Sequence, residues 1–247
     1  MSHFSLRSVV PIGLFCLAVA NASGTTIQDF DNANGSLAPG STVLAYAGVV
    51  GSSTCANASS LFEKGTYAIG NNARDCHSLW STTGPQNSGS TSNFMIVNGD
   101  PTNKDVVYQQ MITVVAGQAT SFSVWLTGLY SSNPAGITLK VFDGTNVGLG
   151  GNLLAASPEF AVNLSSPPSP AAWEKLSTAS FQTLSNTITI QVVNSSRVES
   201  GNDFGLDTLD ITQTAHALDP VPEPATFLLA GLSLVVVAFL RPKVALR

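Results

Sequence analysis

The chain has 247 residues, of which 44% are hydrophobic and 10% are charged, and its formal net charge is −5. Residues 23–220 carry six Lys and Arg against fourteen Asp and Glu, a net charge of −8, and contain no basic stripe. This acidic balance argues against a nucleic-acid or anionic-lipid partner, because both are bound through cationic patches. The same stretch is long enough for one domain with a hydrophobic core.

Residues 1–22 have the pattern of a secretory signal peptide. Arg7 supplies a charged start, an apolar stretch runs from Val9 to Ala20, and small residues fit A-x-A cleavage at Ala18–Ala20 or Ala20–Ala22. The residues before Cys16 do not match a lipidation signal. The sequence therefore predicts export by the secretion machinery.

Residues 23–214 are predicted to form one all-β domain, an antiparallel β-sandwich. Short segments of alternating apolar and polar residues recur between Gly, Pro and Asn turns, and no helical period competes with them. The inward-facing sets of the three clearest segments are Phe122, Val124 and Leu126; Ile137, Leu139 and Val141; and Ile188, Ile190 and Val192.

Two cysteines, Cys55 and Cys76, remain after signal-peptide removal. In an exported chain a pair of cysteines indicates a disulfide. A loop of this length would contribute about 3 kcal/mol in the chain-entropy model. The alternative, a metal-binding pair, lacks further Cys or close His ligands in the sequence.

The order of the strand motifs adds a resemblance. "FMIVNG", "VVYQQMITVVAGQATSFSVWL", "AWEKLSTASF", "NTITIQVVNSS" and "GNDFGLDTLDIT" follow one another. Together they resemble the galactose-binding-like jelly roll, over roughly Tyr67 to Thr212. The resemblance implies a two-sheet sandwich. It leaves the function open, because this architecture occurs in binding modules, adhesins and enzyme appendages.

Asp207 is the candidate ligand of a structural calcium ion. The apolar phase shifts between Phe204/Leu206 and Leu209/Ile211, so Asp207 shares the face of the second pair unless a bulge intervenes. An inward carboxylate needs a partner or a metal. Related jelly rolls place such an Asp on calcium with an acidic residue near the first strand, which here implies Asp31, or Asp29. Alternatively, Asp207 accepts hydrogen bonds from loop amides or lies at a solvent-facing bulge.

Aromatic side chains are the candidate platforms for a carbohydrate ligand. Trp125 opposes the inward phase of its strand, Trp80 lies in a polar loop near the expected disulfide, and Tyr130 lies beside a turn. Trp80 is expected to be the most exposed of them. For Trp125 and Trp173 the alternative is packing under a second sheet or a long loop.

Catalytic signals are weak, so no enzyme activity is predicted. His77 and His216 are the histidines of the exported part, and no nucleophile-elbow motif accompanies them. Two apposed carboxylates would be required for a glycosidase, and no glutamate stands in such a context.

The C-terminus combines "VPEP" (Val221, Pro222, Glu223, Pro224), the uncharged run from Ala225 to Leu240, and a basic tail that begins at Arg241. The run would give a helix of about 24 Å at ~1.5 Å per residue, and the cations after it favour a cytoplasmic end. The prolines keep the preceding segment extended.

These three parts in order resemble the PEP-CTERM sorting signal of Gram-negative bacteria. The resemblance implies a linker (215–220), a sorting signal (221–247) and an exosortase as partner. The protein would be held in the inner membrane, facing the periplasm, before its delivery to the cell surface or extracellular matrix. A plain C-terminal anchor is the alternative.

Three functions remain open for the exported domain. Non-catalytic binding of a carbohydrate or exopolysaccharide is the first, and a structural or adhesive surface role without a defined ligand is the second. The third, a hydrolase, would require a cleft that contains His77 or two glutamates.

Overall fold

The computed structural model describes residues 22–31, 41–42, 47–48, 55, 61–86, 92–102, 106–147, 151–198 and 200–214. They belong to one unit, Asn21–Ala215. The expected signal peptide (apart from Ala22), the linker and the sorting signal lie outside the described residues. Within the described ranges no helix is long and apolar enough to cross a membrane.

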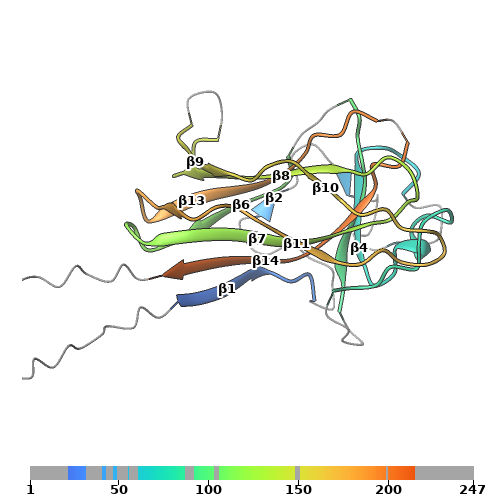
Figure 1. Cartoon of the computed structure of the whole chain (residues 1–247), viewed down its shortest axis with the longest axis horizontal. Helices are drawn as coiled ribbons and strands as arrows, with labels where there is room; N and C mark the ends of the chain where they lie inside the picture. The colour runs from blue at the N-terminus through green and yellow to red at the C-terminus, as the bar shows by residue number, and fades with distance from the viewer. Residues whose placement is uncertain are drawn as a thin grey trace, which may run out of the picture. The chain divides into compact units, whose positions relative to one another are not determined.

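Two β-sheets, A and B, face each other (Figure 1). Among the described residues, sheet A contains β1 (Ala22–Gln28), β3 (Ala47–Gly48), β4 (Thr66–Gly70), β5 (Phe94–Asn98), β7 (Ala119–Gly128), β11 (Glu174–Ser177), β12 (Phe181–Gln182) and β14 (Phe204–Thr214). Sheet B contains β2 (Ser41–Thr42), β6 (Val106–Thr113), β8 (Gly136–Asp143), β9 (Leu153–Ala156), β10 (Phe160–Ala161) and β13 (Thr187–Asn194). One 3-10 turn, η1 (Ala73–Asp75), follows β4.

The strand order is that of a jelly roll. Sheet A runs β11-β7-β14-β5-β4-β3, and sheet B runs β10-β8-β13-β6-β2. The successive strands β5, β6, β7 and β8 alternate between the sheets, as β13 and β14 do, so the chain crosses from one sheet to the other between them. The pairs β4–β5 and β8–β9 are instead successive in the chain and adjacent in one sheet. The pairings are antiparallel except for the short pair β3–β4. The predicted all-β antiparallel sandwich is confirmed.

The main core lies between the sheets and follows the predicted alternation. The inward residues of β7, β8 and β13 are buried, and they belong to one cluster with residues from β5, β6 and β14. Each fully buried aliphatic or aromatic side chain of this kind stabilises the fold by about 1.5–3 kcal/mol relative to exposure.

A bulge in β14 resolves its phase shift. The register changes between Asp207 and Asp210, and Thr208 has a φ of 40°. Phe204 and Leu209, on either side of the bulge, therefore both reach the main core. Asp207 is paired opposite Trp125 on β7, so it lies on the outer face of sheet A and does not share the face of Leu209.

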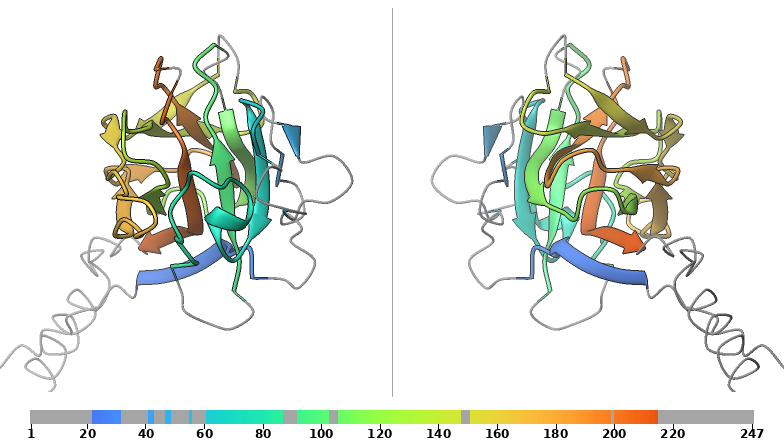
Figure 2. Two further views of the ribbon diagram at one scale, coloured as in Figure 1. Left: turned by 90° about the vertical axis from the view of Figure 1, so that its right-hand side faces the viewer. Right: turned by 90° about the vertical axis from the view of Figure 1, so that its left-hand side faces the viewer.

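The strand β5 is buried on both faces, because a second core covers its outer side. Met95 and Val97 point into the main core, whereas Phe94 and Ile96 join a smaller cluster built from the segment 61–83. The other buried members of that cluster are Leu61, Ala68, Ala73, Cys76, Trp80 and Leu129. Figure 2 (left) looks onto the end of the sandwich that carries η1 and this segment.

The predicted disulfide between Cys55 and Cys76 is confirmed. It ties the segment before β4 to the residue that follows η1. Leu61 N donates to Cys76 O over 3.1 Å, and Asn98 Nδ2 donates to Leu61 O over 2.6 Å. The second core is thus covalently closed and hydrogen-bonded to the end of β5.

Candidate functional site

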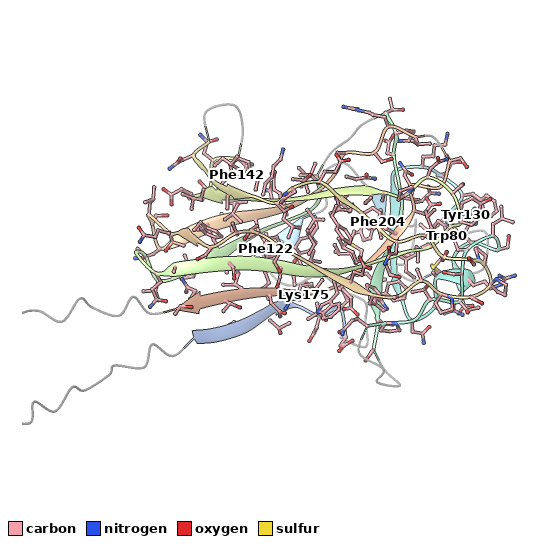
Figure 3. All side chains as sticks on the ribbon, in the orientation of Figure 1. Trp80, Phe122, Tyr130, Phe142, Lys175 and Phe204 are labelled. Atoms are coloured by element: carbon pink, nitrogen blue, oxygen red, sulfur yellow. A yellow bond between two sulfur atoms is a disulfide. The ribbon has the colours of Figure 1, made fainter. Side chains whose placement is uncertain are left out.

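A cleft of about 320 Å³ opens at the end of the sandwich, where several strands of sheet A connect through loops. We call it the aromatic cleft. Its lining residues are Phe62, Lys64, His77, Leu79, Trp80, Asn98, Tyr130, Ser200, Gly201 and Asp203. Figure 3 shows Trp80 and Tyr130 at this end, opposite to the end where β14 finishes. Because β1 pairs Ala22 with Thr214, both outermost described residues lie at that opposite end.

Three stacked rings form one side of the cleft. The Phe62 and His77 ring centroids are 4.1 Å apart, and those of His77 and Trp80 are 4.8 Å apart. Exposure falls along the stack, from 53% for Phe62 to 1% for Trp80. Phe62 is therefore the ring that remains available to a ligand, and the two inner rings support it.

His77 acts as the middle ring rather than as an exposed base. Burial lowers the pKa of its imidazole, and its Nδ1 accepts a hydrogen bond from Leu79 N over 3.3 Å. Both faces of the ring are covered. The cleft does contain His77, the residue that the hydrolase alternative requires.

Asp203 is the one carboxylate among the described lining residues of the cleft. Trp80 Nε1 donates to its Oδ2 over 3.0 Å, and Gly99 N donates to its Oδ1 over 3.2 Å. Burial raises the pKa of Asp203 to about 6, although these two hydrogen bonds act in the opposite direction. A carboxylate has about four acceptor positions, so Asp203 can still accept ligand hydroxyls.

Close backbone packing fixes the wall formed by the loops before β8 and β14. A Cβ on Gly201 would lie 1.9 Å from Ser132 O, and Gly201 has a φ of 93°. Only glycine fits both conditions without strain. Asn133 Nδ2 donates to Ser200 O over 2.8 Å. The two loops are thus held together beside Tyr130.

The three predicted aromatic platforms do not share one site. Trp80 and Tyr130 line the aromatic cleft together, whereas Trp125 lies on the outer face of sheet A. The expectation that Trp80 is exposed is wrong. Its indole is buried because it packs in the second core and donates a hydrogen bond to Asp203, which lies 123 residues further along the chain. Trp173, expected to pack under a sheet or loop, contacts Phe94 edge-on.

Phe62, Lys64 and Asp203 were not anticipated as site residues. Phe62 precedes the short turn into β4, and its exposure depends on the stack against His77. Asp203 immediately precedes β14. The one usable signal is local: Phe62 and Lys64 lie two positions apart, just before Gly65, which has a φ of 71°.

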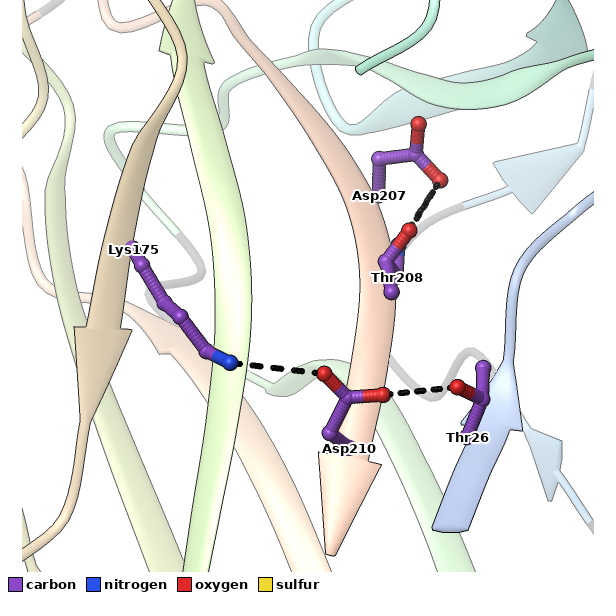
Figure 4. A network of polar contacts seen from close by, with 5 residues as sticks. All are labelled: Thr26, Lys175, Asp207, Thr208 and Asp210. Carbon is purple, nitrogen blue, oxygen red and sulfur yellow. Dashed lines mark hydrogen bonds and ion pairs between the residues drawn. The ribbon is translucent and has the colours of Figure 1, made fainter. Parts of the chain in front are cut away.

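The outer face of sheet A carries a polar network that contains Thr26, Lys175 and Asp210 (Figure 4), and Trp125 lies beside it. Lys175 Nζ lies 5.9 Å from the Trp125 ring centroid and 3.4 Å from Asp210 Oδ2. Thr26 Oγ1 donates to Asp210 Oδ1 over 2.8 Å. These contacts link β11, β14 and β1 across the sheet, and the Lys175 ammonium lies over the Trp125 ring.

Asp31 and Asp207, the predicted calcium ligands, form an acidic pair. Asp207 is 1% exposed and accepts hydrogen bonds from Gln86 N and Thr208 N, over 2.9 and 2.7 Å. The pKa of Asp207 is raised to about 6, mainly by burial and to a smaller extent by the nearby charge of Asp31, while its hydrogen bonds act in the opposite direction. Asn93 N donates to Asp31 over 3.1 Å.

Oxygen ligands of this kind suit calcium. However, the described ranges contain no group of three or more His, Cys, Asp or Glu side chains arranged around a metal. Asp29 accepts a hydrogen bond from Asp31 N over 3.2 Å. The calcium site remains a prediction, with Asp31 and Asp207 as the side chains that would hold the ion.

Comparison with known proteins adds a sorting motif. Residues 220–241 match the model of the PEP-CTERM protein-sorting motif, so the predicted C-terminal signal is confirmed at the level of sequence. It contains Val221, Pro222, Glu223, Pro224 and Arg241. No curated protein matches the chain by sequence.

Several solved structures are distantly similar. The CBM22-1 xylan-binding domain from Paenibacillus barcinonensis is 10% identical, with 82% of this chain and all of that chain covered and a TM-score of 0.43. The EclA C-terminal domain, a sugar-binding protein, is 17% identical over 44% of this chain and 67% of that chain, with a TM-score of 0.35. A Stig cyclase from Fischerella sp. TAU is 11% identical over 60% and 74%, with a TM-score of 0.42. At these TM-scores, none of the similarities assigns a ligand or an activity to this chain.

Proposed function

We propose that this protein is an exported, exosortase-sorted surface protein that binds a carbohydrate without catalysis, through the aromatic cleft. The observation that carries the proposal is the exposed Phe62 ring, which is supported by His77 and Trp80 and faces the same cleft as Asp203. Sugars combine apolar C–H faces with hydroxyl groups. They are therefore bound by aromatic rings together with a few placed polar groups.

The polar groups of the cleft fit this chemistry. Asp203 can accept hydrogen bonds from ligand hydroxyls, and Lys64 and Asn98 line the same space. The rigid surroundings favour binding, because a preorganised site loses little conformational entropy when a ligand enters. The closed second core and the packed Gly201 wall supply that rigidity.

The sorting motif supports the cellular part of the proposal. A protein with this motif would be exported, held transiently in the inner membrane by its apolar C-terminal run, and processed by an exosortase. The aromatic cleft lies at the end of the sandwich opposite to Thr214, where the described domain ends.

Affinity electrophoresis tests the binding activity. The purified exported protein is run through gels that contain bacterial polysaccharides, the producing strain's own matrix included. At least one glycan is expected to retard the protein, and Phe62→Ala should abolish the retardation. Val198→Ala is the matched control, because Val198 is 43% exposed and lines a different depression. Failure of every glycan to retard the wild type would favour a structural role without a ligand.

Mass spectrometry of the mature protein tests the sorting. Export and processing predict loss of the first 22 residues and of the segment that follows "VPEP". A native protein that still ends at Arg247 would identify the C-terminus as a plain anchor.

A further inference from the structure

The size and place of the aromatic cleft restrict what it can bind. Its volume of about 320 Å³ is at the lower end of the ~300–1,000 Å³ typical of small-molecule sites. The cleft lies beyond the strand ends, among loops, and does not run along a sheet face, where a long groove could hold several sugars in a row.

Fixed loops bound the cleft on two sides. On one side, Gly201 abuts Ser132 and Asn133 Nδ2 donates to Ser200 O. On the other side, the segment that carries Phe62 is held to β5 by the hydrogen bond from Asn98 Nδ2 to Leu61 O. Neither wall can move aside without breaking these contacts.

The interior of the cleft combines aromatic side chains with polar atoms. Phe62 offers the exposed ring, and Asp203 is held by Trp80 and Gly99 with acceptor capacity to spare. A sugar at the end of a glycan carries a free hydroxyl at a position where an interior sugar carries a glycosidic bond. A site that hydrogen-bonds a hydroxyl discriminates strongly against ligands that lack it.

We propose that the aromatic cleft recognises a terminal sugar of a glycan, with its ring on Phe62 and its free hydroxyls toward Asp203, rather than an interior stretch of the chain. The inference rests on the proposed carbohydrate-binding function and makes it more specific. A terminal sugar can stand at the end of the main chain or form a single-residue branch. Both carry the same free hydroxyls, and the experiment below distinguishes them.

Titration calorimetry with oligosaccharides of increasing length tests the inference on the exported protein. The ligands come from the glycan that retards the protein in electrophoresis, from one residue to six. The dissociation constant is expected to reach its final value at one or two residues and to change less than twofold beyond that. A tenfold or larger decrease between the disaccharide and the hexasaccharide would overturn terminal recognition and leave carbohydrate binding intact.

Variants and end-modified ligands complete the test. Phe62→Ala should weaken binding of the shortest bound ligand at least tenfold, and Phe62→Trp should preserve it. Leu184→Ala is the control, because Leu184 is 63% exposed and lies in the loop before β13, outside the cleft. Cutting a linear polymer internally with an endoglycosidase should increase the amount of protein bound per gram of glycan, because each cut creates a new non-reducing end, whereas debranching should abolish binding if branches are bound. Unchanged binding after both treatments would overturn the inference.

Discussion

Asp203 and Asp207 lie close together in the chain, and burial raises the pKa of each to about 6, but they belong to different regions. Asp203 lies in the aromatic cleft and holds Trp80, with no second carboxylate among the described lining residues. Asp207 lies on the outer face of sheet A, and the charge of Asp31 acts on it. A raised carboxyl pKa therefore occurs in two different settings. Asp203 is a hydrogen-bond acceptor held by Trp80, and Asp207 is one half of an acidic pair with Asp31.

The two tryptophans differ in the same way. Trp80 is buried at the inner end of the stack, so among the three stacked rings Phe62 is the one open to the cleft. Trp125 is half-buried, and Lys175 lies over its ring. In the cleft, the Phe62 ring thus remains exposed. On the outer face of sheet A, the Trp125 ring is instead covered by Lys175.

The largest expected effect comes from removing the disulfide, which lies beside the aromatic cleft and away from Trp125 on the outer face of sheet A. Replacing Cys55 and Cys76 by Ser should lower the free energy of unfolding by about 3 kcal/mol, because the disulfide closes a loop of 21 residues. Urea unfolding measures the loss. Hydrogen exchange should accelerate around Phe62 and His77 and remain unchanged around Trp125. Equal acceleration of hydrogen exchange around Phe62 and around Trp125 would contradict the conclusion that the disulfide stabilises the cleft in particular.

Calcium should act on the acidic pair alone. At about 100 times its dissociation constant, an ion bound by Asp31 and Asp207 would raise the unfolding free energy by about 2.7 kcal/mol. Asp207→Asn should remove this increment, and Asp203→Asn should retain it. Thermal unfolding with calcium and with chelator is the measurement. Identical midpoints in the wild type would show that Asp207 relies on its amide hydrogen bonds instead.

The pH dependence of stability follows from the raised pKa of Asp203. Its folded-state pKa of about 6 exceeds the ordinary value of 3.8, so the native state binds the proton more tightly than the unfolded state. The contribution of Asp203 to stability is full below pH 3.8 and is lost as the pH rises through 6. From pH 4 to pH 7, Asp203→Asn should therefore gain stability relative to wild type, on the order of 2 kcal/mol.

Urea unfolding at pH 4, 5, 6 and 7 checks this difference. Asp207→Asn should behave similarly in chelator, because its pKa is raised in the same direction. In calcium, Asp207→Asn should no longer gain stability relative to wild type as the pH rises, since a bound cation favours the ionised carboxylate of the wild type. A flat difference for Asp203→Asn across this range would contradict the burial of its carboxylate.

The smallest expected effect concerns the polar network on sheet A. Lys175→Ala should cost less than about 1 kcal/mol, because partly exposed ion pairs contribute only ~0.2–1 kcal/mol. Uncovering Trp125 should shift its fluorescence to longer wavelength without altering glycan binding. A decrease in the unfolding free energy of more than about 2 kcal/mol would contradict the view that this network contributes only a partly exposed ion pair.

The sequence predicted the main core well, because period-2 alternation reports directly on a two-sheet sandwich. The phase shift around Thr208 indicated that either an inward Asp207 or a bulge was present, and the structure has the bulge. The second core was not predictable, since the segment 61–83 has no periodicity. Its burial depends on contacts with β5 and with Asp203, which are distant in the chain.

Trp80 shows why the site was only partly predicted. Its polar neighbours Ser78 and Ser81 indicated exposure, but burial is decided by the stack with His77 and the bond to Asp203. Tyr130, a candidate because it lies beside a turn, is among the residues that line the aromatic cleft. Phe62 could not be identified from the sequence, because its role in the cleft depends on its contact with His77 in the folded structure.

The most direct test of the central claim is a calorimetric titration of wild-type, Phe62→Ala and Trp125→Ala proteins with the same glycan. If the aromatic cleft is the binding site, Phe62→Ala weakens the affinity at least tenfold and Trp125→Ala changes it less than twofold. The opposite order, with binding lost in Trp125→Ala and kept in Phe62→Ala, would place the ligand on the face of sheet A and contradict the account.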